Sequence, residues 1–215
     1  MRFSIQPFRS KSSTRLASRR LLILFAIIVL PILTGCLGTD VGGDSNGWNP
    51  PTSVDGIIYI GTKDGEVIAL VDDGSGNLQD KWSFPSNLGQ DDLSGVYNTP
   101  IVQGNLVYVN GIDGFLYALD RESGQLTDEG WKRPESFFEE PEPLVAGPAP
   151  DPSNDIILSP SEDGKLYAYT AKNGNQFWDP FVTDGPIWST PSIQDGIAYF
   201  GSHDHSVYAV TLNDG

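Results

Sequence analysis

The sequence predicts an all-β fold built from one module that occurs four times between residues 51 and 215. In every copy a proline stands 18 residues before an alanine, and an aspartate stands five residues before it. No sustained 3.6-residue apolar period follows residue 36, so no helix is predicted there. The alanines are Ala69, Ala118, Ala168 and Ala209; the prolines are Pro51, Pro100, Pro150 and Pro191; the aspartates are Asp64, Asp113, Asp163 and Asp204. This repeat decides the architecture before any single site is considered.

A hairpin is the central element of each module. In the first copy two extended segments, 57–60 and 66–70, flank Asp64-Gly65. Isoleucine, valine and tyrosine suit a pleated surface that packs on both faces. Asp-Gly favours a tight turn because glycine adopts positive φ at little cost. The equivalent turn residues are Asp113, Gly114, Asp163, Gly164 and Asp204, the last followed by His205.

Two shorter elements flank each hairpin. A short extended piece follows the proline, and a fourth segment is expected to end in Trp82, Trp131 or Trp178. Four short strands in a repeat of 41 to 50 residues predict one blade of a β-propeller. We therefore expect residues 48–215 to form about four blades, as a partial ring of seven or eight; the alternative is that the four blades close on themselves or pair with another copy. The last blade is expected to be incomplete, because Gly215 stands where its fourth strand should begin.

The residues after the alanine resemble a known family. The stretch 168–178, AYTAKNGNQFW, resembles the tryptophan-docking motif AxDxxTGxxxW of pyrroloquinoline-quinone-type (PQQ-like) propellers, including BamB-like lipoproteins of outer-membrane protein assembly. The stretch 118–124 matches the first half of the motif, with Trp131 three residues later than the pattern expects, and 69–82 shows the same lengthening. The resemblance implies PQQ-like blades in which each tryptophan packs against the neighbouring blade.

The N-terminus indicates export. Six basic and no acidic residues in 1–20 precede thirteen apolar residues, too few for an ordinary spanning helix. We interpret 1–35 as a lipoprotein signal peptide, because 33–36, Leu-Thr-Gly-Cys, resembles a bacterial lipobox with Cys36 as the lipidated residue. The Gly- and Asp-rich stretch 36–47 is then a flexible tether. The protein is expected outside the cytoplasm, anchored to a membrane facing the periplasm or at the cell surface. The route of export, twin-arginine or general secretion, stays open.

Charge excludes one class of partner. Seven basic and 28 acidic residues follow residue 35, a formal net charge of −21. Nucleic-acid binding needs a basic footprint, so it is not expected. The charge fits either a soluble secreted surface or a basic protein partner. In the stretch 135–142, ESFFEEPE, Phe137 and Phe138 either anchor such a partner or fold back onto the blades.

Metal and catalytic sites compete with simpler explanations. The stretch 203–205, His-Asp-His, could hold a small metal ion, but it also aligns with the hairpin turn. The four repeated aspartates could form a calcium ring, but turn chemistry also explains them. A Ser-His-Asp triad is not expected, because both histidines occupy one hairpin. We therefore assign no catalytic, cofactor or metal residue.

Two functions remain as hypotheses. The first is a non-enzymatic, lipid-anchored scaffold that binds envelope proteins, in outer-membrane protein assembly, through inter-blade loops at 83–99 and 132–149. The second is the N-terminal part of a periplasmic quinoprotein dehydrogenase that binds PQQ and Ca²⁺. The family's dehydrogenases usually carry an adjacent cysteine pair, and Cys36 is the only cysteine here. The sequence favours the scaffold and leaves catalytic activity open.

Overall fold

The computed structural model describes residues 49–85, 93–126, 130–134, 141–213 and 215. Every described residue lies in one compact unit within residues 44–215. Several predicted features lie outside the described residues: the signal peptide 1–35, Cys36, the tether 36–47, Trp48, Phe137 and Phe138.

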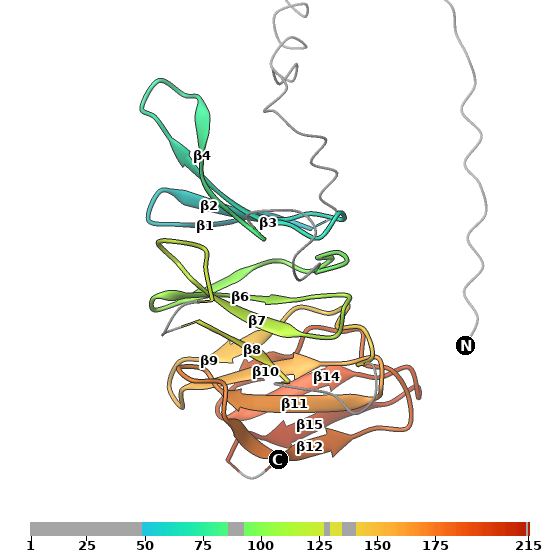
Figure 1. Ribbon diagram of the computed structural model, residues 1–215. Coiled ribbons are helices and arrows are strands. Elements are labelled where there is room, and N and C mark those ends of the chain that lie inside the picture. The colour runs from blue at the N-terminus through green and yellow to red at the C-terminus, as the bar shows by residue number, and fades with distance from the viewer. Residues whose placement is uncertain (1–48, 86–92, 127–129, 135–140, 214) are drawn as a thin grey trace, which may run out of the picture. The chain divides into compact units, whose positions relative to one another are not determined.

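The described residues form four antiparallel sheets, three of four strands and one of three (Figure 1). None of these residues forms a helix that is long and apolar enough to cross a membrane. Blade 1 contains β1 (Thr52–Val54), β2 (Ile57–Gly61), β3 (Val67–Asp72) and β4 (Leu78–Phe84). Blade 2 contains β5 (Ile101–Gln103), β6 (Leu106–Asn110), β7 (Leu116–Asp120) and β8 (Trp131–Arg133). Blade 3 contains β9 (Ala149–Asp151), β10 (Ile156–Pro160), β11 (Lys165–Thr170) and β12 (Gln176–Val182). Blade 4 contains β13 (Ser192–Gln194), β14 (Ile197–Gly201) and β15 (Val207–Thr211).

The predicted hairpins join the two central strands of each blade. In blade 1, the N–H of Thr62 donates to the carbonyl of Glu66 over 2.8 Å, which closes the turn between β2 and β3. Gly65 adopts a φ of 86° inside this turn, a conformation that glycine reaches without strain. In blade 4 His205 occupies the same place with a φ of 71°. The turn therefore keeps a positive φ at this position even where histidine replaces glycine.

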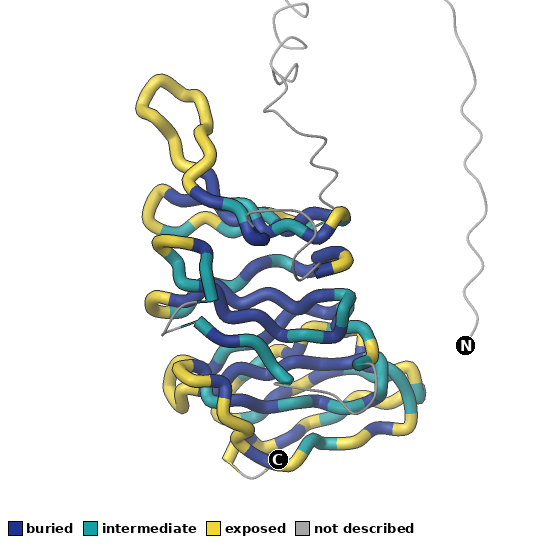
Figure 2. The backbone as a smooth tube through the Cα atoms, viewed as in Figure 1, coloured by how far each residue is buried: buried dark blue, intermediate teal, exposed yellow. Residues whose placement is uncertain are grey.

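One face of each blade packs on the opposite face of the next. Tyr59, Val67 and Ala69 of blade 1 form one buried cluster with Val107 and Leu119 of blade 2. Equivalent clusters join blade 2 to blade 3 and blade 3 to blade 4. Figure 2 shows the resulting buried strands in dark blue, and an exposed β3–β4 hairpin in yellow. The apolar core is thus divided into three seams, as expected for repeats that contact mainly their neighbours.

The outward face of blade 4 is exposed where its equivalents are buried. Tyr199 is 43% exposed and Val207 is 83% exposed. Their counterparts in blade 1, Tyr59 and Val67, are fully buried in the first seam. The difference follows from position, because no described residues pack on this face as blade 2 packs on blade 1.

The first strands of successive blades lie next to one another. β1 contacts β5, β5 contacts β9, and β9 contacts β13. The later strands of each blade follow in order outward, from the first strand to the fourth. This arrangement gives the blades a common inner edge, which is the defining geometry of a propeller.

The expected end of the fourth strand was wrong. β4 runs two residues past Trp82 to Phe84, and β12 runs past Trp178 to Val182. The extra residues pair with the start of the third strand, where Val67 faces Phe84 and Lys165 faces Val182. Each tryptophan lies directly opposite the repeat alanine instead. Ala69 faces Trp82, Ala118 faces Trp131 and Ala168 faces Trp178.

The tryptophans of blades 1 and 2 also reach the following blade. The Trp82 indole N–H donates to the Arg121 carbonyl over 2.9 Å. The Trp131 indole N–H donates to the Ala171 carbonyl over 3.0 Å. The rings lie against a glycine of that blade, since a Cβ on Gly124 would stand 2.4 Å from Trp82 and one on Gly174 would stand 2.6 Å from Trp131. The indole thus fixes both the distance and the register between blades.

The seam between blades 2 and 3 should be sensitive to a single methyl group. Gly174 has a φ of 68°, so Gly174→Ala adds backbone strain to a clash with Trp131. We expect a loss of about 2–4 kcal/mol in the free energy of unfolding, measured by urea denaturation. Gly56→Ala is the matched control, because Gly56 has a φ of 77° and a Cβ added there would have no atom within 4 Å. It should cost about 1 kcal/mol. Equal losses in the two variants would contradict the docking argument.

Candidate functional site

The repeated aspartates are bound within their own hairpins. The Asp163 carboxylate accepts the N–H of Lys165 over 2.9 Å and the O–H of Tyr167 over 2.6 Å. Blades 2 and 4 repeat this arrangement, with Tyr117 on Asp113 and Tyr208 on Asp204. Asp64 differs, because it has an isoleucine four residues later and pairs with Lys63. The aspartates therefore brace turns, and the tyrosine four residues on was the signal that the sequence analysis missed.

The three braced aspartates have different pKa values. Burial raises the pKa of Asp113 to about 6, even though Tyr117 and the Phe115 N–H donate to it. Burial acts in the same direction on Asp163, but hydrogen bonds from Tyr167 and Lys165 outweigh it and lower its pKa. The Lys165 ammonium lies 3.1 Å from the Asp163 carboxylate, whereas Phe115 occupies the equivalent position in blade 2. For Asp204, the Tyr208 hydrogen bond lowers the pKa to about 2.

The predicted metal candidates do not converge. Within the residues described, no three His, Cys, Asp or Glu side chains are grouped so that they could hold a metal ion. The ring of His203 packs against Trp188, with 4.0 Å between ring centroids. Asp204 is engaged with Tyr208 and with the Ser206 N–H. His203 and Asp204 thus have contacts within and beside the turn that need no ion.

A pocket of about 420 Å³ opens at the common inner edge of the blades. The segments that enter the first strand of each blade line it. Tyr97 and Trp188 supply its aromatic walls, and they are 45% and 50% exposed. Both side chains stand three residues before the repeat proline, where blade 3 has Gly147. Asn49, Asn98, Thr99, Val145, Ala146, Pro148 and Thr190 are among the other lining residues.

A hydrogen-bond network supports this pocket from behind. The Asn98 side chain donates to the Asn110 carbonyl over 2.6 Å and accepts from its N–H over 3.2 Å. The Asn110 amide donates to the Ala146 carbonyl over 2.8 Å, and Ser159 donates to its oxygen over 2.9 Å. Blades 2 and 3 are therefore joined by buried hydrogen bonds of the Asn110 side chain, in which the amide nitrogen and the amide oxygen both have partners. Such a network makes the wall of the pocket rigid.

The other blades use related contacts at the same register. The Ser189 hydroxyl donates to the Gly201 carbonyl over 3.0 Å and accepts from its N–H over 2.8 Å, as Asn98 does with Asn110. The amide of Asn49 donates to the Val96 carbonyl over 3.2 Å and also to the Asn98 carbonyl. Asn49 and Asn98 each stand two residues before a repeat proline. This repeated asparagine was visible in the sequence, but its hydrogen-bond partners were not: Asn98 bonds within its own blade, and Asn49 bonds to the segment that enters the next one.

Comparisons with known proteins agree with this geometry. Residues 128–215 match a family model described as "Outer membrane protein assembly factor BamB". BamB from Moraxella catarrhalis is similar in structure, with a TM-score of 0.59 and 22% identity over 77% of this chain and 50% of that one. The chain thus spans about half the length of that BamB. No curated protein sequence matches the chain.

Two computationally designed proteins are also similar in structure. The designed Ika4 protein has a TM-score of 0.60 and 18% identity, covering 82% of this chain and 99% of that one. The designed Ika8 protein has a TM-score of 0.57 and 18% identity, and the match covers 77% of this chain and 46% of that one. The four sheets thus define a β-propeller of antiparallel blades. Residues 128–215 are similar to the BamB family model, and the propeller fold is the one that the tryptophan motif predicted.

The pKa of Asp113 should produce a pH dependence of stability. A folded-state pKa of about 6 lies above the ordinary value of 3.8, so the stability present below pH 4 is lost as the pH rises through 6. Asp113→Asn removes this ionisation and keeps an acceptor for Tyr117. At pH 7 the variant should gain about 1–2 kcal/mol in unfolding free energy relative to the wild type, and little at pH 4.

Asp204→Asn is the control for this titration. The low pKa of Asp204 means that its contribution is present above pH 4 and is lost as the pH falls through 2. Denaturation midpoints across pH 4 to 7 should therefore rise relative to the wild type for Asp113→Asn alone. A parallel rise for Asp204→Asn would show that hairpin charge in general, and not the burial of Asp113, is responsible.

Proposed function

We propose that this protein is a non-enzymatic, lipid-anchored propeller that binds envelope proteins outside the cytoplasm, as a scaffold in outer-membrane protein assembly. The match of residues 128–215 to the BamB family model carries this proposal. Similarity of fold alone would leave many functions open, because one fold serves many activities. The surface and charge of the blades supply the further support.

The pocket at the inner edge of the blades suits a protein partner. Tyr97 and Trp188 present large aromatic surfaces that remain partly exposed in the protein alone. Tyrosine and tryptophan are enriched among the side chains that dominate binding energy at interfaces. Their backbones enter blades 2 and 4, whose inner edges are held by the Asn98 and Ser189 contacts. A rigid wall lowers the entropy cost of docking.

The repeat aspartates support a structural role over a catalytic one. Asp113, Asp163 and Asp204 each accept a tyrosine O–H and a backbone N–H from their own hairpin. A carboxylate held in this way by its own turn is already occupied as an acceptor. We therefore assign these three residues to the blades themselves.

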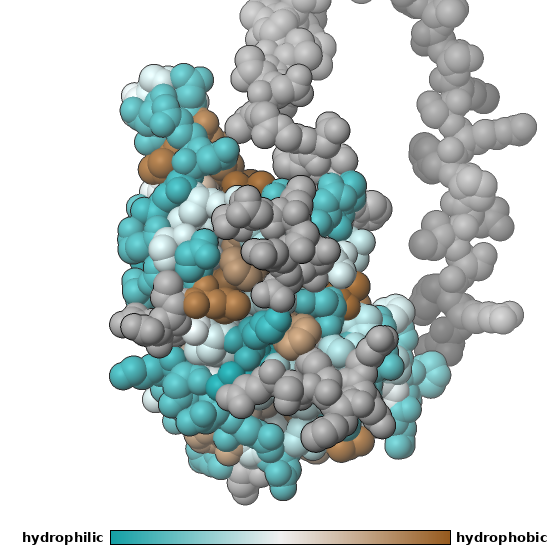
Figure 3. Space-filling model, in the orientation of Figure 1, coloured by the Kyte–Doolittle hydropathy of each residue, from teal (hydrophilic) through white to brown (hydrophobic). Residues whose placement is uncertain are grey.

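Charge favours a basic region on the partner. The part of the chain after residue 35 carries a formal net charge of −21. The face in Figure 3 shows hydrophilic side chains over most of the described surface, with small separate apolar areas. An acidic surface of this kind speeds association with a basic partner and makes the rate depend on salt.

Membrane attachment through Cys36 is part of the proposal. Cys36→Ser should move the protein from the membrane fraction to the soluble fraction of cells that express the complete chain, because the serine hydroxyl cannot receive the thioether-linked lipid. Leu37→Ala leaves the cysteine in place and serves as the control. Retention of Cys36→Ser in the membrane fraction after a high-salt wash would argue against the lipid anchor.

Site-specific crosslinking tests the scaffold role. A photo-crosslinking amino acid at position 97 should capture an envelope protein of the barrel-assembly pathway, identified by mass spectrometry. The same amino acid at Phe177 is the control, since Phe177 is 42% exposed but lies on the outer strand β12. Trp188→Ala should reduce capture from position 97 by about tenfold, in line with the loss of an aromatic anchor. Equal capture from positions 97 and 177 would count against the pocket as the docking surface.

A further inference from the structure

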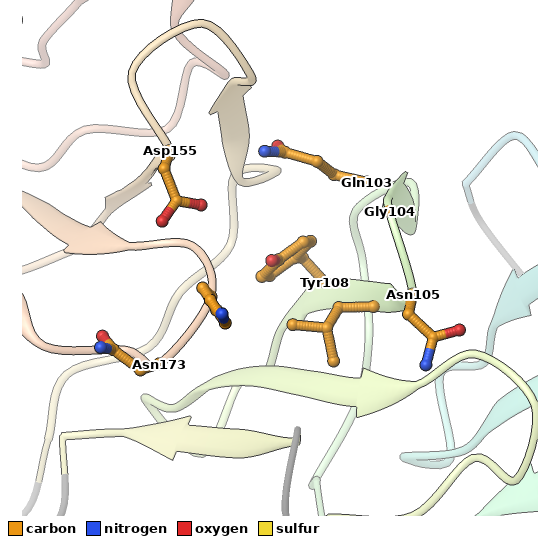
Figure 4. A pocket seen from close by; sticks show the side chains of 8 residues that line it. Gln103, Gly104, Asn105, Tyr108, Asp155 and Asn173 are labelled. Atoms are coloured by element: carbon orange, nitrogen blue, oxygen red, sulfur yellow. The ribbon is translucent and has the colours of Figure 1, made fainter.

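A second pocket, of about 520 Å³, lies between blades 2 and 3. Gln103, Gly104 and Tyr108 line it from blade 2, and Asp155 and Asn173 line it from blade 3. Figure 4 shows the Gln103 and Tyr108 side chains projecting from blade 2 toward Asp155 and Asn173. This pocket is separate from the one at the inner edge, because the two share no lining residue.

The equivalent space between blades 1 and 2 is filled by an arginine side chain. Arg121 extends from blade 2 back to blade 1, where its Nε donates to the Tyr59 hydroxyl over 3.1 Å. One terminal nitrogen donates to the Val54 carbonyl over 3.2 Å and to the Asp55 carboxylate over 2.7 Å. The first seam therefore contains a complete guanidinium site built from one hydroxyl, one carbonyl and one carboxylate.

The three seams differ at one register position. Arg121, Ala171 and Leu212 each stand three residues after the repeat alanine. Each backbone N–H donates to the carbonyl of the equivalent turn residue in its own blade, Asn105, Asp155 or Gly196, over 2.7 to 2.9 Å. Their side chains therefore start from the same place in each blade. Arginine fills the first seam, and leucine is fully buried in the third. In the second seam Ala171 is buried in the core, and the pocket opens beside it, where its neighbour Lys172 is among the lining residues.

The open seam keeps the tyrosine hydroxyl of the filled one and has two other side-chain acceptors. By register, Tyr108 corresponds to Tyr59, Gln103 to Val54 and Gly104 to Asp55. The Tyr108 hydroxyl donates to the Ala171 carbonyl over 2.9 Å, which leaves its oxygen able to accept. The Oε1 atom of Gln103 is buried and has no hydrogen-bond partner within the described part of the chain. Asp155 places a carboxylate on the same pocket.

We propose that this pocket binds an arginine side chain of a protein partner, in the place that Arg121 fills one seam earlier. A buried, unpartnered acceptor is costly, and a guanidinium supplies five donors in a fixed fork. Lys172 also lines the pocket, and its ammonium group repels a bound cation, so the Asp155 carboxylate must balance that repulsion. Leu212 shows that an aliphatic side chain can occupy the corresponding place, but the Gln103 and Tyr108 oxygens favour a donor.

The inference extends the proposed scaffold function by naming a chemical group that the partner presents. It can fail independently of that function. The crosslinking experiment at position 97 needs the partner and not this pocket, whereas a small arginine probe needs the pocket and no partner.

Titration with Nα-acetyl-arginine amide, followed by NMR, tests the pocket directly. The Trp131 indole N–H reports on binding because it donates to the Ala171 carbonyl next to the pocket. Nα-acetyl-citrulline amide has nearly the same shape without the charge, and we expect it to bind about tenfold more weakly. Nα-acetyl-leucine amide tests the aliphatic alternative. Equal binding of arginine and citrulline, or tighter binding of leucine, would overturn the assignment, as would no response to arginine at all.

Two substitutions move the affinity in opposite directions. Ala171→Arg recreates the internal side chain of the first seam and should abolish the response to the arginine probe. Gly104→Asp supplies the missing equivalent of Asp55 and should tighten probe binding by about five- to tenfold. Gly104 has a φ of 60° with no atom within 4 Å of a Cβ, and Asp55 itself has a φ of 51°, so the backbone accepts aspartate there.

Gly74→Asp is the matched control for added charge. Gly74 has a φ of 82°, nothing within 4 Å of a Cβ, and a place in the exposed β3–β4 hairpin of blade 1. It should leave the probe affinity unchanged. If Ala171→Arg fails to fold, Gly104→Asp still decides the question. An unchanged affinity in Gly104→Asp, or the same gain in Gly74→Asp, would refute the site.

Discussion

The contact between a tryptophan of one blade and a glycine of the next is the constraint on which the rest of the structure depends. The indole of Trp82 lies on Gly124 and that of Trp131 lies on Gly174, at distances that leave no space for a side chain. The indole N–H then fixes the register through the Arg121 or Ala171 carbonyl. A flat aromatic body sets the separation and one polar atom sets the alignment, which is how tryptophan serves buried contacts in general. The apolar seams, the inner pocket and the space beside Tyr108 all follow from blades held at this spacing.

At that spacing, the two faces of a blade pack against different neighbours. The face with the repeat alanine packs against the following blade, and the opposite face accepts the preceding one. The repeat alanine on the third strand lies directly opposite the tryptophan on the fourth, at the pairs Ala69–Trp82, Ala118–Trp131 and Ala168–Trp178. A larger side chain at that position would compete with the indole for the same buried volume. The small side chain of the repeat alanine therefore leaves the volume that the indole occupies.

The fold could be predicted from the sequence because its rules are local and repeated four times. The hairpins at Asp64-Gly65 and Asp113-Gly114 depend on turn chemistry within a few residues, and the structure has them as expected. The strand boundary after Trp82 was wrong because pairing with Val67 extends β4, and pairing is not a local property. The pockets were not predicted at all. They depend on contacts between blades, such as the hydrogen bond from the Asn110 side chain to the Ala146 carbonyl, and no spacing within one repeat reports such a contact.

The side chain at the Arg121 register position shows how a repeat protein acquires individual sites without changing its fold. The backbone at Arg121, Ala171 and Leu212 makes the same hydrogen bond in each blade, so the side chain at this position varies on a fixed backbone. What changes is the content of the seam: an ion pair with Asp55, an open space, or a buried aliphatic group. An exposed ion pair of this kind contributes little to stability, since the Asp55 side chain is 75% exposed. The Arg121 side chain also donates to the Tyr59 hydroxyl and to the Val54 carbonyl, so it fills its seam through more than the ion pair. Where alanine stands at this register position, the seam has an open pocket, which under our proposal receives an arginine of a partner. One variable side chain on a fixed backbone thus makes one seam of a repeated scaffold differ from the others.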